Sequence, residues 1–218
     1  MIQPAINAAS SGDTISIGSG TYSQNLTIAK NLTLTGSGKP TATRSSGSTA
    51  TVVSISSGTV GFQGLPISGG AGSNGSPCGI SVASGCTLTV SGCTVTQNSG
   101  GIGGGIANNG TLTVTNSTIS GNTAVGGAGI LNTATATVVG SYILNNNATF
   151  SAAGLESTNA MTVTTSNISG NTTAQTAGGL FIESGTATVR DSTLNGNTAT
   201  NTSGGGIGSG GRQTIPAR

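Results

Sequence analysis

The sequence contains no histidine and no tryptophan, and only 5% of its 218 residues are charged. An average soluble domain has about 25% charged residues, so chemistry that needs many titratable groups has few candidates here. The net charge is +2, and Lys and Arg form no cluster. Because nucleic acids and anionic membranes are bound through basic patches, the sequence supports neither as a partner.

The residues needed for a metal site or a membrane span are also missing. A structural zinc site usually takes four Cys or His ligands, whereas this chain has three Cys and no His. We therefore expect no metal and no cofactor. No apolar run reaches the roughly 18 residues of a membrane span. The first residues show no basic segment followed by an apolar one, so we expect no signal peptide within this sequence.

What the chain does contain is an internal repeat. The segment 103–124, GGGIANNGTLTVTNSTISGNTA, returns downstream in altered form. Anchored on the valine of TLTV, successive repeats are spaced by 24, 24, 25 and 26 residues, at Val90, Val114, Val138, Val163 and Val189. A fixed period of this size is typical of a solenoid.

Each repeat holds three short apolar segments with turn residues between them. They are a Gly-Ile or Gly-Leu pair, a Leu-x-Val segment or its variant, and an Ile or Leu three residues before an Asn. Alternation of apolar and polar residues predicts strands. Identical positions in successive coils would stack about 4.8 Å apart, and parallel strands joined in this way wind right-handed. We predict an all-β, right-handed parallel β-helix of three-strand coils.

The whole chain, 1–218, is predicted to be one domain. Residues 1–13 form an N-terminal helix cap, in which Ile2 and Ile6 share a face. Irregular first coils with loops follow over 14–79, and regular coils of about 25 residues over 80–208. Residues 209–218 are predicted to be a truncated or uncapped end, whose open edge could stack on another molecule.

Two motifs carry a family resemblance. Residues 103–106 (GGGI) and 177–180 (AGGL) are variants of Gly-Gly-Ala-[Ile/Leu/Val], and 119–122 (ISGN) matches Phe-x-x-Asn with Ile in place of Phe. These units resemble the repeats of polymorphic outer membrane protein-type bacterial surface proteins, which belong to the pectate-lyase-like superfamily of parallel β-helices. The resemblance implies an extracellular or bacterial cell-surface location. It also implies a non-enzymatic role, as an adhesin-like passenger or a self-associating structural unit.

Outward positions beside the buried valines are occupied almost entirely by threonine. This candidate binding strip comprises Thr87, Thr89, Thr111, Thr113, Thr135, Thr137, Thr162, Thr186 and Thr188, with Ala160 as the one exception. Such a double column resembles the ice-binding face of certain β-helical antifreeze proteins. Threonine is also simply a favoured outward strand residue. The strip therefore makes ice binding the alternative function, with ice or glycan surfaces as possible partners.

Asparagines three residues after the last apolar position of each repeat predict a structural ladder. They are Asn98, Asn122, Asn146, Asn171 and Asn197. Asn tolerates left-handed backbone at a corner, and its amides can bond from coil to coil. Cys93 occupies a position that is serine in later repeats, so it is expected in the core. Cys78 and Cys86 could form a disulfide, which spacing alone leaves open.

An enzymatic function is the least favoured one, because the chain has only four acids, Asp13, Glu156, Glu183 and Asp191. Polysaccharide lyases and hydrolases on this fold use clustered carboxylates for calcium or for acid–base chemistry. Glu156 and Glu183 could lie on neighbouring coils, but we expect both to be solvated surface charges. The Gly-x-Gly-x-x-Gly at 70–75 is not followed by a helical pattern and is interpreted as a loop. We therefore predict no enzymatic activity.

Overall fold

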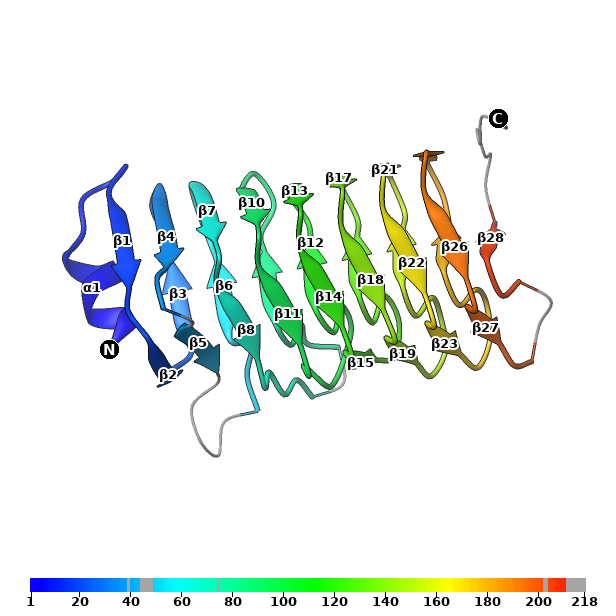
Figure 1. Cartoon of the computed structure of the whole chain (residues 1–218), viewed down its shortest axis with the longest axis horizontal. Helices are drawn as coiled ribbons and strands as arrows, with labels where there is room; N and C mark the ends of the chain where they lie inside the picture. Colours follow the sequence, from blue (N-terminus) through cyan, green and yellow to red (C-terminus); the bar gives the residue numbers. More distant parts are fainter. Residues whose placement is uncertain (39, 44–48, 74, 202–203, 211–218) are drawn as a thin grey trace.

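The computed structural model describes residues 1–38, 40–43, 49–73, 75–201 and 204–210. Its short strands stack along one long axis as parallel coils, and helix α1 (Ile2–Ala8) lies at the N-terminal end of the stack (Figure 1). The predicted parallel β-helix with an N-terminal helix is confirmed. Of the predicted end at 209–218, residues 211–218 lie outside the described part of the chain.

Three sheets run the length of the stack, and all their pairings are parallel. Sheet I contains, in spatial order, β1 (Thr14–Ile17), β4 (Leu32–Gly36), β7 (Thr59–Gln63), β10 (Thr87–Ser91), β13 (Thr111–Thr115), β17 (Thr135–Val139), β21 (Ala160–Thr164) and β25 (Thr186–Arg190). Sheet II contains β2 (Gly20–Ser23), β5 (Pro40–Thr43), β8 (Pro66–Ser68), β11 (Thr94–Thr96), β14 (Thr118–Ser120), β18 (Tyr142–Leu144), β22 (Asn167–Ser169) and β26 (Thr193–Asn195).

Sheet III closes each coil, and a fourth, smaller sheet lies between sheets II and III along the chain. Sheet III contains β3 (Leu26–Ile28), β6 (Val53–Ile55), β9 (Ile80–Val82), β12 (Ile106–Asn108), β16 (Ile130–Asn132), β20 (Leu155–Ser157), β24 (Leu180–Ile182) and β28 (Ile207–Ser209). Sheet IV contains β15 (Thr123–Ala124), β19 (Asn147–Ala148), β23 (Thr172–Thr173) and β27 (Thr198–Ala199). The prediction of three strands per coil was therefore incomplete, because a two-residue strand is too short to show alternation in the sequence.

The apolar positions of the repeat form the core. Val90 pairs with Val114, Val114 with Val138, and the register continues unbroken to Val189. Side chains from sheets I, II and III fill the interior as one continuous cluster, to which Phe62 contributes the largest fully buried side chain. The strands of 14–79 pair in the same sheets, so the irregular first coils share the core of the regular ones.

Helix α1 covers the first coil through two isoleucines. Ile2 and Ile6 are both 2% exposed and pack into the core cluster. At the start of the helix, the amides of Ile2 and Gln3 donate to Oε1 of Gln24, at 2.6 and 3.2 Å. Since the first amides of a helix have no partner within it, Gln24 supplies the missing acceptor.

The asparagine ladder runs through the interior rather than along the surface. Asn122 is typical: its Nδ2 donates to Oδ1 of Asn146 and to the carbonyl of Val95, both at 3.0 Å. Its backbone amide donates to the same Oδ1 at 3.0 Å. The same pattern links all five predicted members, Asn98, Asn122, Asn146, Asn171 and Asn197.

The left-handed residue at this corner precedes the asparagine. Positive φ angles occur at Gln97, Gly121, Asn145, Gly170 and Gly196, so the idea that the ladder asparagines themselves take this conformation was wrong. The tight turn is made one residue earlier, which points the next side chain inward. The buried amides are then satisfied by neighbouring coils instead of by water.

A glycine column lies against the asparagine ladder and explains the Gly-Ile and Gly-Leu pairs. A Cβ atom built on Gly105 would lie 2.5 Å from the carbonyl oxygen of Gly129 and 3.1 Å from Nδ2 of Asn122. The same clash, at 2.3 to 2.4 Å, occurs for Gly79, Gly129, Gly154 and Gly179. Glycine is needed here because successive coils approach too closely for any side chain.

Two further ladders stabilise other corners. The backbone amide of Cys93 donates to Oγ of Ser117 at 3.1 Å, and Ser117, Ser141, Ser166 and Ser192 repeat this contact along the stack. At the last residues of two sheet III strands, β12 and β16, Nδ2 of Asn108 donates to Oδ1 of Asn132 at 2.7 Å. Cys78, Cys86 and Cys93 are all buried and free. The core position of Cys93 is thus confirmed, and the possible Cys78–Cys86 disulfide is absent.

We expect Asn122→Ala to destabilise the protein by about 3 kcal/mol or more. The change removes the acceptor for the backbone amide and Nδ2 of Asn98 and the donor to the carbonyl of Val95. Each buried polar group left unsatisfied costs about 1–3 kcal/mol. Urea unfolding followed by circular dichroism would measure the loss. Asn109→Ala, at an exposed asparagine after β12 whose Oδ1 accepts a surface hydrogen bond from Thr133, is the matched control and should change stability by less than about 0.5 kcal/mol. Equal stability of the two variants would contradict a structural role for the ladder.

Candidate functional site

Two regions of the surface have features beyond those the fold requires. The first is the threonine strip on the outer face of sheet I, where threonines alternate with the buried core residues of each strand. One column is Thr89, Thr113, Thr137, Thr162 and Thr188, paired directly from strand to strand. The other is Thr87, Thr111, Thr135, Ala160 and Thr186, in the same register.

The strip is a two-dimensional array because the register is exact over five strands. Threonines two residues apart on a strand are separated by about 7 Å, and those on adjacent strands by about 4.8 Å. Toward the N-terminus, the Thr89 column is interrupted at β7, where Gly61 pairs with Thr89, whereas Thr59 continues the other column by pairing with Thr87. It is bordered by a mixed outward column, Ser91, Thr115, Val139, Thr164 and Arg190.

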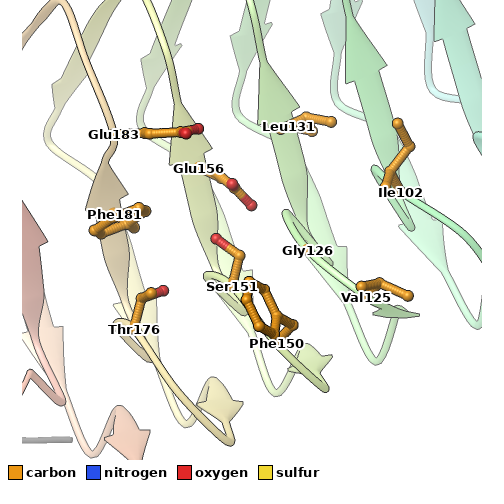
Figure 2. A pocket seen from close by; sticks show the side chains of 10 residues that line it. All are labelled: Ile102, Val125, Gly126, Leu131, Phe150, Ser151, Glu156, Thr176, Phe181 and Glu183. Carbon is orange, nitrogen blue, oxygen red and sulfur yellow. The ribbon is translucent and has the colours of Figure 1, made fainter. Parts of the chain in front are cut away.

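The second region is a cavity on the outer face of sheet III, about 260 Å³ in volume. The outward side chains of sheet III form its floor, and the segments that precede the sheet III strands in successive coils form its walls (Figure 2). It is lined by Ile102, Val125, Gly126, Leu131, Phe150, Ser151, Glu156, Thr176, Phe181 and Glu183.

A glycine in the wall of the cavity lets one loop approach the sheet closely. A Cβ atom built on Gly126 would lie 2.8 Å from Oε2 of Glu156 and 3.0 Å from Cβ of Ser151. Leu131, Glu156 and Phe181 are neighbours in register on β16, β20 and β24, so their side chains share the outer face of sheet III. The backbone of Gly126 therefore lies directly against the Glu156 carboxylate.

Glu156 is the unusual group of this cavity. It is 8% exposed, and its Oε2 atom accepts no hydrogen bond from the described residues. Burial raises the pKa of Glu156, and the negative charge of Glu183 raises it further. Hydrogen bonding from the Ser151 side chain and from the backbone of Gly127 and Ala152 opposes that rise in pKa. The expectation that Glu156 is a solvated surface charge was therefore wrong.

Glu183 differs from Glu156 in its exposure. It is exposed at the rim of the cavity, on the coil next to that of Glu156. Figure 2 shows the two carboxylates on adjacent coils, with the Ser151 hydroxyl close to Glu156. The expected placement of the two acids on neighbouring coils is confirmed.

The other two acids lie elsewhere. Asp13 accepts the backbone amide of Ser10 at 2.7 Å in the turn after α1, and Asp191 follows β25 with a positive φ. Within the described ranges, no group of three or more His, Cys, Asp or Glu residues is placed to hold a metal ion.

The sequence analysis missed the cavity, although one signal was present. Outward positions of sheet III are apolar at Leu131 and Phe181, where a solvent-facing strand would carry polar residues. An apolar outward position predicts a covering segment, here the loop around Gly126.

The described helix is not long and apolar enough to cross a lipid bilayer.

Comparison with known proteins gives the family. Residues 53–216 match the model of the family described as a right handed beta helix region, about three quarters of the chain, so the chain belongs to this family. Among solved structures, the chain is similar to pectate lyase Pel9A, with a TM-score of 0.50 and 14% sequence identity. That similarity covers 99% of this chain and 72% of the lyase, and it shows a shared fold. The curated proteins gave no match.

The raised pKa of Glu156 predicts a stability that falls as pH rises. In the folded protein the carboxyl group holds its proton to a higher pH than in the unfolded chain, where its pKa is about 4.3. The stabilising difference is complete below that value and is lost as pH rises through the folded pKa. Glu156→Gln stays neutral, so its melting temperature should exceed that of the wild type at about pH 8 and approach it at about pH 4.

Thermal unfolding at both pH values would measure this crossover. Glu183→Gln is the matched control, because an exposed glutamate loses little solvation on folding, and its effect should be clearly smaller. A Glu156→Gln variant that is less stable than the wild type at about pH 8 would contradict this prediction. It would show that interactions in the folded protein offset the cost of burying the Glu156 charge.

Proposed function

We propose that the chain is a non-enzymatic β-helix scaffold, secreted or displayed at a bacterial cell surface. The observation that carries this proposal is the unbroken coil-to-coil register from β10 to β25, held inside by the Asn and Ser ladders. Because each coil contacts only its neighbours, a solenoid is rigid to the extent that these contacts repeat without defects. A long, stiff body with low charge suits a stalk or passenger that presents a repetitive surface.

The fold supports this location as well. Parallel β-helices are common among extracellular proteins. Fold alone does not determine activity, so the scaffold proposal and a lyase activity like that of the structural neighbour must be separated by experiment.

We expect no protein-dependent cleavage of polygalacturonate, with or without added calcium. A lyase breaks the glycosidic bond by β-elimination, and the unsaturated product is followed by its ultraviolet absorbance. The blank and a Glu156→Gln/Glu183→Gln double variant serve as controls. Product that grows in proportion to the amount of protein and disappears in the double variant would overturn the scaffold proposal in favour of an enzyme.

Ice binding is the second candidate function, and the register of the threonine strip favours it. Nine threonines occupy two columns on one sheet, with repeat distances of about 7 and 4.8 Å. Methyl and hydroxyl groups at fixed spacing can order water into an ice-like layer. The strip has no charged residue within its two columns, which suits contact with a neutral surface.

If the strip binds ice, the wild type should show thermal hysteresis and shape ice crystals. Thr113→Tyr/Thr137→Tyr places two bulky rings in the middle of one column and should remove most of the activity. Thr96→Tyr, on the outer face of sheet II, is the matched control and should leave it intact. No hysteresis in folded wild-type protein would remove ice binding and leave the scaffold proposal with glycan surfaces to be tested next.

A further inference from the structure

We propose that the cavity beside Glu156 binds a small organic cation, an ammonium group carried on an apolar stem. This inference is independent of the scaffold and ice-binding proposals, because the cavity lies on sheet III and the threonine strip on sheet I. The argument rests on a buried carboxylate, an exposed apolar cluster and the size of the cavity.

One oxygen of the buried Glu156 carboxylate lacks a partner, although the carboxylate accepts hydrogen bonds from Ser151 and from the backbone of Gly127 and Ala152. Oε2 of Glu156 is buried and accepts no hydrogen bond from the described residues. Neither a Lys nor an Arg is among the described residues that line the cavity. An ionised carboxylate out of water is costly unless a positive charge or hydrogen-bond donors compensate it. An ammonium ion supplies both, with three N–H donors on one charge.

The walls of the cavity are apolar and exposed. The described part of the chain has five large exposed hydrophobic residues, and three of them, Ile102 (37%), Val125 (40%) and Phe150 (55%), line this one cavity. Their clustering is unlike the scattered single residues of an ordinary surface. An apolar stem placed between them would remove their surface from water.

The aromatic rings add a preference for a cation. In Figure 2, Phe181 lies on the strand next to that of Glu156, and Phe150 lies on the far side of Ser151 from the Glu156 carboxylate. An ammonium group within about 6 Å of a ring face gains roughly 0.5–1 kcal/mol at an exposed site. The Glu183 carboxylate at the rim adds a second negative charge, which attracts cations and repels anions.

Size and lining define the ligand further. At about 260 Å³ the cavity is smaller than the roughly 300–1,000 Å³ of typical drug-sized ligand sites, so a short alkylamine fits better than a polymer. Calcium takes 6–8 oxygen ligands, and half of the ten lining residues are apolar. A lysine side chain of another protein has the same chemistry as a free alkylamine.

The test is a chemical-shift titration of the ¹⁵N-labelled chain with n-butylamine, 1-butanol, calcium chloride and Nα-acetyl-lysine amide. We expect saturable shifts with n-butylammonium, centred on the amides around Gly126 and Ser151, and no saturation with butanol. Binding of blocked lysine as tight as that of butylamine would identify a protein side chain as the source. Binding of butylamine alone would identify a free amine.

Three variants make the test specific. Glu156→Gln keeps the shape of the side chain and should weaken butylammonium binding at least about tenfold, equivalent to roughly 1.4 kcal/mol. Phe150→Leu, at an exposed position, should weaken binding about threefold by removing the ring. Glu183→Gln, at the rim, should weaken it by no more than about threefold, because exposed charges contribute little.

Several results would overturn the proposal. They are equal binding of 1-butanol, preferential binding of calcium, shifts spread over the whole surface, no binding, or unchanged affinity in Glu156→Gln. Circular dichroism and thermal unfolding of each variant verify that the fold is retained. Glu156→Gln removes a buried charge, and Phe150→Leu alters an exposed side chain, so both variants are expected to fold.

Discussion

The regular coils share one repeated contact, the hydrogen bond between asparagine side chains of successive coils. Each ladder amide donates to the next asparagine and to a backbone carbonyl, and this fixes the spacing between coils at one corner. The glycine column beside it removes every side chain that would hold the coils apart. Together they set the register of sheets II and III, and the buried valines of sheet I follow that register.

The regular arrangement of surface residues follows from the register of the interior. Successive coils are stacked in register, one strand spacing apart. A residue type that recurs at the same outward position of each coil therefore forms a straight column on the surface. On sheet I, threonine recurs at two outward positions of successive strands and forms an uncharged array. On sheet III, by contrast, the outward column changes from Ala107 to Leu131, Glu156 and Phe181. One sheet therefore presents a uniform surface, and the other presents a single local site.

That local site shows how a solenoid can acquire chemistry without a catalytic cluster. The loops between sheets IV and III fold back over the outer face of sheet III, and Gly126 lets backbone reach the Glu156 carboxylate. The acid is then desolvated by a segment about 30 residues earlier in the chain. The raised pKa of Glu156 results mainly from this burial, whereas Glu183 on the next coil is exposed.

The sequence by itself determined the period, the inward and outward alternation, an N-terminal helix within 1–13 and the members of the asparagine ladder, because these follow from local spacing and from neighbours one repeat apart. It did not predict the serine ladder or the Asn108–Asn132 contact. It missed the two-residue strands of sheet IV, since two residues show no periodicity. It also placed Glu156 in solvent, because two acids without a third partner are usually surface charges. Only the tertiary structure decided that a loop covers the outer face of sheet III at Glu156. Burial there depends on how loops fold across coils, and strand periodicity carries no information about that path.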